Sequence, residues 1–181
     1  GLTHGGSPAC NRVLVNGATT VALPAGNYDF YSSRGPFSTL GAMQGVVVEA
    51  ITGQSVLLEI ESLDVQPTGT LSGDFHVHGG KSFDANIPDV DRVKAFVASG
   101  VDVIVSTEHD VVNDYAEAIA ALAVADRLLM ITGTESTGHL LFRFREDYGF
   151  PQVVGHWMFW PVAYDPEGPY RGAAWDEKAE P

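Results

Sequence analysis

Between residues 71 and 136 the chain alternates short, nearly continuous apolar runs with longer amphipathic stretches. Three of the apolar runs have the length of buried strands, and each of them ends in polar residues. Strands that are buried on both faces and separated by helices are typical of a parallel sheet wrapped by helices. The pattern therefore predicts an α/β fold in the order β-α-β-α-β, with strands at 71–78, 101–110 and 127–136.

The two stretches between these strands carry helix signals. Within residues 87–100, apolar side chains recur at helical spacing, and Gly100 marks the end of the helix. Residues 113–126 are rich in alanine, and Asn113 or Asp114 is placed to cap the start of this second helix. The apolar positions of the first helix are Val90, Val93, Phe96 and Val97.

Residues 12–65 show a shorter rhythm. Four β-type runs follow one another, separated by turn residues such as Asn16-Gly17 and Thr52-Gly53-Gln54. Runs of this length and spacing predict a small antiparallel β-sandwich. The pattern breaks in the segment QPTGT, at residues 66–70, so we expect a sandwich domain at 1–68 and an α/β domain at 69–181.

Composition narrows the class of protein. Of the 181 residues, 45% are hydrophobic and 18% charged, as expected for a globular protein with a packed core. The net charge of −13 disfavours binding to nucleic acid, because phosphate backbones repel an acidic protein. No apolar run reaches the roughly 20 residues of a membrane span, so we expect none. The single cysteine, Cys10, excludes a disulfide within the chain.

Histidines and acidic residues gather where the predicted strands end. His76 and His78 are two residues apart, so on a strand both imidazoles point to the same face, about 6–7 Å apart. His109 ends the second strand and Glu135 ends the third. Carboxyl ends of parallel strands meet at one rim, and imidazole and carboxylate are ligands for zinc, manganese and iron. The pattern predicts a metal site, although a solvent-facing histidine pair would also explain His76 and His78 taken alone.

Two aspartates adjoin this set. Asp84 lies in the loop after the first strand, where it is either a further metal ligand or a loop or N-cap residue. Asp110 follows His109 directly, and a carboxylate there is placed to orient an imidazole or to relay a proton in catalysis.

The last histidines are His139 and His156, each preceded by glycine and followed by apolar residues. Either or both are placed to join the rim, and the pattern itself leaves the role of His139 open. Trp157 and Phe159 follow His156 closely and are candidates for the apolar wall of a substrate pocket. A core aromatic cluster is the alternative for these rings.

Four ordered segments, DFHVHGGKSFD, VDVIVSTEHD, ITGTES and GHWMFWP, together resemble the polymerase-and-histidinol-phosphatase (PHP) superfamily, and within it the branch that includes carbaryl-type carbamate hydrolases. The resemblance covers residues 71–161. It implies a distorted seven-stranded (β/α) barrel that holds two or three divalent metal ions and hydrolyses phosphoesters and sometimes other esters. Separately, LPAGNYDFYSSRG resembles an edge of carboxypeptidase-regulatory-like modules.

The resemblance also implies roles for single residues. Trp157 and Phe159 sit where relatives often carry pocket residues, and the second motif reads Thr-Glu-His here instead of the more usual Thr-Asp-His. The implied metal ligands are His76 and His78 of the first motif, Asp84 at a position of His or Asp, His109 of the second motif, the bridging Glu135 and the next histidine, His156.

The family pattern ends with a further histidine and an Asp-x-His pair, which have no counterpart here after His156. A half-barrel would expose a strand edge and half of its core. We therefore expect a second polypeptide, separated by cleavage, to supply the rest of the barrel. A half-barrel completed by dimerisation is the alternative.

These observations lead to one functional expectation and two alternatives. We expect a metal-dependent hydrolase that attacks a small-molecule phosphomono-, di- or triester with a metal-activated water. A carbamate or aryl-ester hydrolase with the same site is the first alternative, and a non-catalytic metal-binding or interaction module is the second. A sandwich module fused to a hydrolase suggests the periplasm or the exterior, by resemblance alone.

Overall fold

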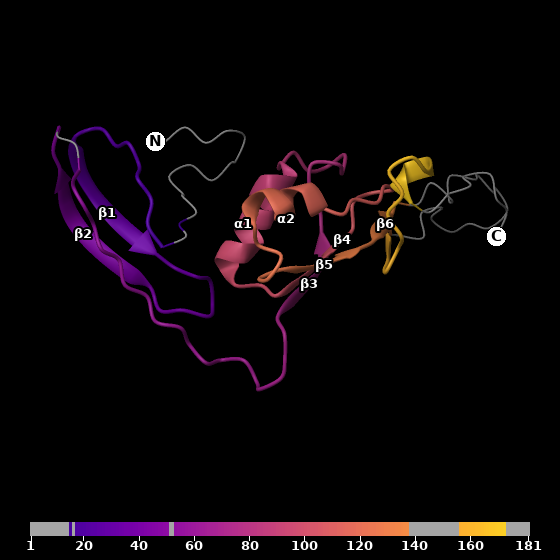
Figure 1. The fold of residues 1–181 in the computed structure, drawn as a ribbon, viewed down its shortest axis with the longest axis horizontal. Helices are drawn as coiled ribbons and strands as arrows, with labels where there is room; N and C mark the ends of the chain where they lie inside the picture. The colour runs from indigo at the N-terminus through magenta and orange to yellow at the C-terminus, as the bar shows by residue number, and fades with distance from the viewer. Residues whose placement is uncertain (1–14, 16, 51–52, 138–155, 173–181) are drawn as a thin grey trace, which may run out of the picture.

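The computed structural model describes residues 15, 17–50, 53–137 and 156–172. In these residues three small sheets form, with strand orders β1-β2, β3-β4-β5 and β6-β7. Figure 1 shows the β1-β2 hairpin at one end, the helices and the parallel sheet in the middle, and β6 beyond them. The elements are β1 (Gly26–Ser32), β2 (Gly41–Val48), β3 (Gly73–Val77), α1 (Asp89–Ser99), β4 (Val103–Ser106), α2 (Ala116–Leu122), β5 (Leu129–Thr132), β6 (Thr134–Ser136), β7 (Trp157–Phe159) and a short 3-10 helix, Pro169–Arg171.

The central unit has the β-α-β-α-β order that the apolar pattern predicts. Strands β3, β4 and β5 are parallel, with β4 in the middle, and α1 and α2 lie together on one side of the sheet (Figure 1). Of these three strands only β4 is buried along its whole length, so the expectation that all three are buried on both faces is wrong for β3 and β5. The core between sheet and helices contains Val77, Val93, Ile104, Tyr115, Ala118, Val124 and Leu128.

The strand predicted at 127–136 is not continuous. It divides at Gly133 into β5, which is parallel to β4, and β6, which is antiparallel to β7. The backbone passes so close to its neighbours there that a Cβ on Gly133 would lie 2.7 Å from the Phe159 carbonyl oxygen and 3.0 Å from that of Ser106. Glycine therefore allows the chain to leave the parallel sheet and to place Glu135 above its edge.

Helix α1 follows the predicted boundaries closely. It ends at Gly100, whose φ of 73° is the left-handed conformation that favours glycine, and the Gly100 N–H bonds to carbonyls of the last turn. Asp89 and Asp91 lie in the first turn, where the helix dipole stabilises negative charge. Neither α1 nor α2 has the length and apolar character that a helix needs to cross a membrane, within the part of the chain that the structure describes.

Helix α2 is shorter than predicted. Its N-cap position is Tyr115, with a left-handed φ of 45°, and Asn113 does not cap it. Asp114 accepts the N–H of Ala116 at 3.1 Å. The reason is tertiary: Asn113 and Tyr115 are buried and turn toward Glu108 instead of continuing the helix.

The N-terminal part is a hairpin with an additional extended segment beside it. The register of β1 and β2 shifts between Tyr28 and Phe30, and the Tyr28 hydroxyl donates to the Pro24 carbonyl at 2.9 Å. Residues 55–65, predicted as a strand, form an isolated bridge between Ser62 and Ser38 and no regular strand. The described residues show a single two-stranded sheet here, so the sandwich stays a prediction.

The hairpin and the linker are anchored on the central unit. A Cβ on Gly35 would lie 2.4 Å from the Ser99 carbonyl oxygen, so the turn packs directly on the end of α1. At the predicted domain boundary, Asp102 Oδ2 accepts the Ser72 N–H and hydroxyl, each at 2.9 Å, and the Gln66 amide at 3.3 Å. One carboxylate thus holds the chain on both sides of residues 67–70.

The hydrogen bond from the Ser72 N–H is the main reason why the pKa of Asp102 lies below its ordinary value, although partial burial opposes the shift. A lowered folded-state pKa means that the stabilisation is complete above the ordinary aspartate pKa, near 3.9, and is lost as the pH falls through the lower folded-state value. We expect Asp102→Asn to reduce the free energy of unfolding at pH 7 by about 1–2 kcal/mol, and this deficit to shrink in acid.

Urea unfolding at neutral and acidic pH measures this deficit. Asp126→Asn, at an exposed carboxylate, serves as the control and should leave stability nearly unchanged. A deficit for Asp102→Asn that stays constant across the pH range would contradict the assigned role of its charge.

Candidate metal centre

Four of the six predicted ligands lie at or near the carboxyl ends of successive strands, whereas Asp84 lies in the loop after β3 and His156 directly precedes β7. His76 is on β3, and His78 is the first residue after that strand. His109 follows β4, and Glu135 is the middle residue of β6. A parallel bridge joins His109 to Glu135, and the Asp110 N–H bonds to the Glu135 carbonyl at 2.9 Å. These backbone contacts continue the sheet beyond Gly133, so the third segment ends beside the first two.

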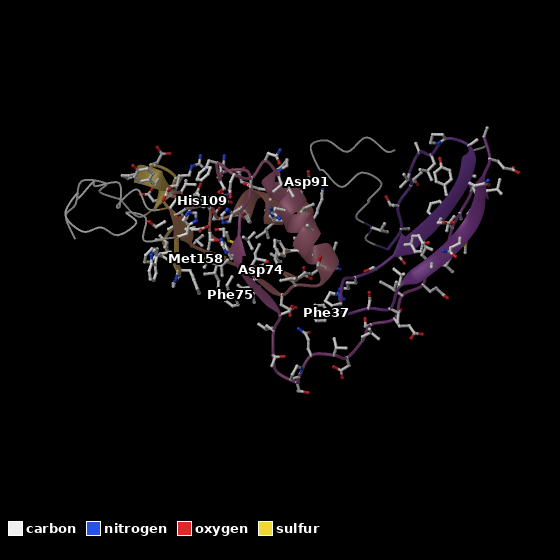
Figure 2. All side chains as sticks on the ribbon, turned by 180° about the vertical axis from the view of Figure 1, so that it is seen from behind. Phe37, Asp74, Phe75, Asp91, His109 and Met158 are labelled. Atoms are coloured by element: carbon white, nitrogen blue, oxygen red, sulfur yellow. The ribbon has the colours of Figure 1, made fainter. Side chains whose placement is uncertain are left out.

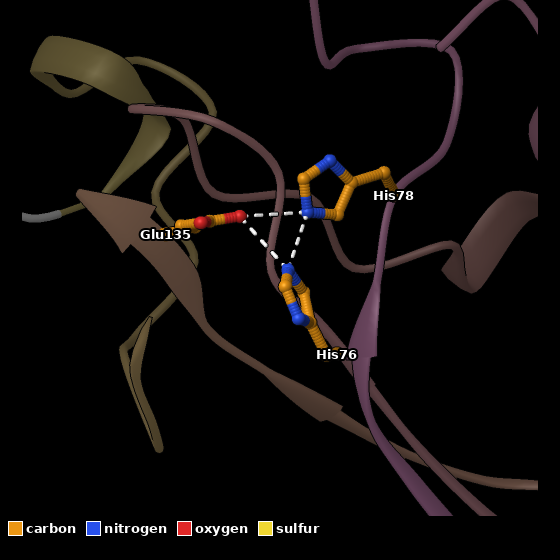
Figure 3. A group of neighbouring side chains, drawn as sticks. All are labelled: His76, His78 and Glu135. Atoms are coloured by element: carbon orange, nitrogen blue, oxygen red, sulfur yellow. Dashed lines mark hydrogen bonds and ion pairs between the residues drawn. The ribbon is translucent and has the colours of Figure 1, made fainter. Parts of the chain in front are cut away.

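Three ligand atoms meet in a tight triangle, which the dashed lines in Figure 3 mark. The Nε2 atoms of His76 and His78 lie 2.9 Å apart. Glu135 Oε2 lies 2.9 Å from the Nε2 of His76 and 2.8 Å from that of His78. Side chains from two separate segments of the chain thus direct their lone-pair atoms to one point.

The second oxygen of Glu135 reaches another histidine. Glu135 Oε1 lies 2.7 Å from His156 Nδ1, and Oε2 lies 3.8 Å from His109 Nδ1. Burial raises the pKa of the Glu135 carboxyl. The hydrogen bond with His76 and the charges of His109 and His76 together lower it by more than burial raises it, so the net pKa lies below its ordinary value. The carboxylate is therefore ionised at neutral pH and has both oxygens engaged.

Asp84 joins two of the histidines. Its Oδ1 lies 3.1 Å from His78 Nδ1, and its Oδ2 lies 3.1 Å from His109 Nε2. The Ser82 hydroxyl donates to Asp84 at 2.7 Å and is the main reason why the pKa of Asp84 lies far below its usual range, with His78 contributing next. Because α1 begins at Asp89, the alternative N-cap role for Asp84 does not apply.

All six predicted ligands lie in one continuous set. Within each of three overlapping groups, one nitrogen or oxygen from every residue lies within 4.8 Å of the others. His139 lies outside the described residues. The groups are His76, His78 and Glu135; His78, Asp84 and His109; and His109, Glu135 and His156.

Asp110 contacts the set indirectly. Its Oδ1 accepts the Thr137 N–H at 2.9 Å, and the Thr137 hydroxyl in turn contacts His109 Nδ1. The sequence allows two roles for Asp110, orienting an imidazole or relaying a proton, and this contact supports the first. The pattern did not point to Thr137, because a threonine two residues after a strand-end glutamate is common in turns.

The strand register separates Trp157 and Phe159 from the site. Glu135 pairs with Met158, and side chains directly opposite in an antiparallel pair share one face. Trp157 and Phe159 therefore point to the opposite face, where both are about half exposed. Figure 2 shows Met158 and His109 at the same end of the central unit. The geometry does not favour the expected pocket role of Trp157 and Phe159.

A buried polar network around Glu108 holds the backbone next to the site. Glu108 is fully buried, and it accepts the Gly79 N–H at 2.8 and 2.9 Å and the Tyr115 hydroxyl at 2.6 Å. Burial is the main reason why the pKa of Tyr115 lies far above its ordinary value, and the Glu108 charge raises it further. Because Gly79 follows His78, this network fixes the backbone that carries a predicted ligand. The sequence signal for this network is the glutamate of Thr-Glu-His, to which the pattern assigns no role.

Comparison of the chain with protein-family models, with curated protein sequences and with solved structures found no match. The PHP-type barrel, the second polypeptide and the bound metal ions therefore stay predictions that rest on this chain's own residues.

Replacing the buried carboxylate tests the network. Glu108→Gln turns an amide N–H toward one of its donors and removes the charge that the others contact, so we expect a loss of about 1.5–3 kcal/mol in the free energy of unfolding. Tyr115→Phe removes one hydroxyl and keeps the Gly79 contact, so its loss should be smaller. Urea unfolding of both variants measures this order, and equal stability of Glu108→Gln and wild type would contradict it.

Proposed function

We propose that this protein is a metal-dependent hydrolase of small phosphoesters. The observation that carries the proposal is the convergence of four histidines and two carboxylates, from separate segments of the chain, into three overlapping groups of ligand atoms. Carbamates and aryl esters are the nearest alternative substrates, because the same activated water attacks an acyl carbon.

The chemistry of these side chains fits a divalent cation better than a network of hydrogen bonds. In the triangle of His76, His78 and Glu135, every pair of atoms is 2.8–2.9 Å apart. A neutral imidazole nitrogen either donates or accepts, so two imidazoles and one carboxylate oxygen cannot satisfy all three contacts at once. Ligands 2.0–2.2 Å from a metal ion are about 2.8–3.1 Å from one another at octahedral angles and about 3.3–3.6 Å at tetrahedral angles, so this spacing matches neighbouring positions around an octahedral ion.

The sharing of residues between groups favours two ions over three. A neutral imidazole has one lone pair, so His78 and His109 can each serve one ion only. The groups His76, His78, Glu135 and His109, Glu135, His156 share only Glu135, whose Oε2 lies beside His76 and His78 and whose Oε1 lies beside His156. Asp84 then accepts hydrogen bonds from the remaining nitrogens of His78 and His109, and it holds both rings in orientation.

Exposure supports catalysis over a purely structural metal site. Structural sites are closed, whereas catalytic sites keep a position open to solvent and substrate. Glu135 and His109 are buried, but the side chains of His76 and His156 are 50% and 47% exposed. The set is thus buried on one side and accessible on the other.

Bound divalent ions would lower the pKa of a water molecule to provide the nucleophile and would neutralise charge on a phosphoryl group. The residues of this chain would bind the ions and orient the histidine rings that hold them. Glu135 stays ionised between the two groups, Asp84 fixes the rings of His78 and His109, and Asp110 fixes Thr137 beside His109. Two adjacent cations would bind a phosphoester anion more strongly than an uncharged carbamate, so we propose phosphoesters as the preferred substrates.

Metal content tests the shared role of Glu135. After loading with Mn²⁺ or Zn²⁺ and gel filtration, we expect about two ions per wild-type chain by elemental analysis. His76→Ala should lose about one, and Glu135→Gln should lose more than His76→Ala, because Glu135 belongs to both groups. His4→Ala, at a histidine to which the pattern assigns no role, is the matched control. Equal losses in His76→Ala and Glu135→Gln would contradict the bridging assignment.

Hydrolysis tests the activity itself. We expect the metal-loaded protein to cleave 4-nitrophenyl phosphate or bis(4-nitrophenyl) phosphate, and a chelator or His78→Ala to lower kcat/KM by more than about 100-fold. An intact mass spectrum under denaturing conditions should show whether a second polypeptide accompanies the chain in the active sample. Hydrolysis of phosphate and aryl esters that resists the chelator would disprove the proposal. Stoichiometric metal without any hydrolysis would favour a binding module.

A further inference from the structure

We propose that Phe83 is a specificity residue that binds an aromatic group of the substrate beside the metal centre. The inference rests on the proposed hydrolase function and narrows its substrates to phosphoesters that carry an aryl group. Its basis is an exposed ring that contacts a predicted ligand directly.

The ring of Phe83 stacks on the imidazole of His109, with the centroids 4.5 Å apart and an angle of 25° between the planes. His109 is buried beneath it, whereas Phe83 is 75% exposed, the highest value among the large hydrophobic side chains that the structure describes. Single exposed apolar residues are common and need no explanation. This one differs because it lies on the site itself, where a substrate would cover it.

The backbone on both sides of Phe83 is held by contacts to the centre. The Ser82 hydroxyl donates to Asp84 and accepts the backbone N–H of His109 at 3.2 Å, and Asp84 contacts His78 and His109. Hydrogen bonds from Ser82 to the Gly79 carbonyl and from Ala85 to the Ser82 carbonyl tighten the loop. The ring is therefore positioned before any ligand arrives, which reduces the entropy lost on binding.

A bound phosphoester would place its organic group next to this ring. Aromatic pairs gain binding free energy beyond the area that they bury. Among the residues that the structure describes, Phe83 stacks on His109 alone, and its other face is open to a ligand. Met158, opposite Glu135 in the β6-β7 register, adds a second apolar side chain on the same face as the carboxylate. An aryl group fits these surroundings better than a methyl group or a sugar.

Binding of two phosphonates that differ only in their organic group tests the inference without turnover. In isothermal titration of the metal-loaded protein, we expect phenylphosphonate to bind about five- to tenfold more tightly than methylphosphonate. Phe83→Ala should abolish the preference and Phe83→Leu should keep part of it, with metal content unchanged in both. Leu57→Ala replaces an equally exposed apolar residue of the N-terminal part and should behave as wild type.

The outcomes separate the two proposals. If Phe83→Ala weakens both phosphonates equally, Phe83 only positions His109 and the specificity role is wrong. An unchanged preference in Phe83→Ala, with 4-nitrophenyl phosphate still hydrolysed, overturns the inference and leaves the hydrolase proposal intact. If wild type binds neither anion and hydrolyses no ester, both proposals fail together.

Discussion

The buried carboxylate of Glu135 is the constraint on which the arrangement of the site depends. An ionised group in the interior is costly unless charges or hydrogen bonds compensate it. Glu135 meets this requirement with histidines on both of its oxygens, His76 and His78 on one and His156 on the other. The segments that carry these histidines must therefore come together wherever β6 places the carboxylate. Removal of one histidine leaves the charge less compensated, so the ligands are coupled to one another energetically.

The backbone around β6 shows how the fold satisfies this requirement. Glu135 donates its N–H to the Glu108 carbonyl at 2.9 Å, and its own carbonyl accepts the Asp110 N–H at 2.9 Å. The segment is thus held on both sides of His109. On the other side of the same turn, the Glu108 side chain holds Gly79, next to His78. Two adjacent residues after β4 therefore have different roles, because Glu108 faces the core and His109 faces the site.

Local pattern was sufficient for some elements and not for others. Helix α1 has both an apolar repeat and a glycine end signal, and these are properties of neighbouring residues, so its bounds were predictable. Helix α2 began later than predicted because burial of Tyr115 against Glu108 outweighed the capping preference of Asn113. Residues 55–65 alternate like a strand, yet a strand also needs a partner edge, and only Ser62 has a bridge there. Pairing between distant segments is not encoded in a local window.

For the site, the residue types and their spacing were enough to predict which side chains meet. Polar residues at the ends of parallel strands reach one rim because strand direction and side-chain alternation are nearly invariant. The sequence could not indicate the turn at Gly133, the use of both Glu135 oxygens, the double contact of Asp84, or the face on which Trp157 lies. Each of these depends on at least one contact between residues that are 21 or more positions apart. Such contacts are decided by close packing and hydrogen bonding in three dimensions, and no local pattern records them.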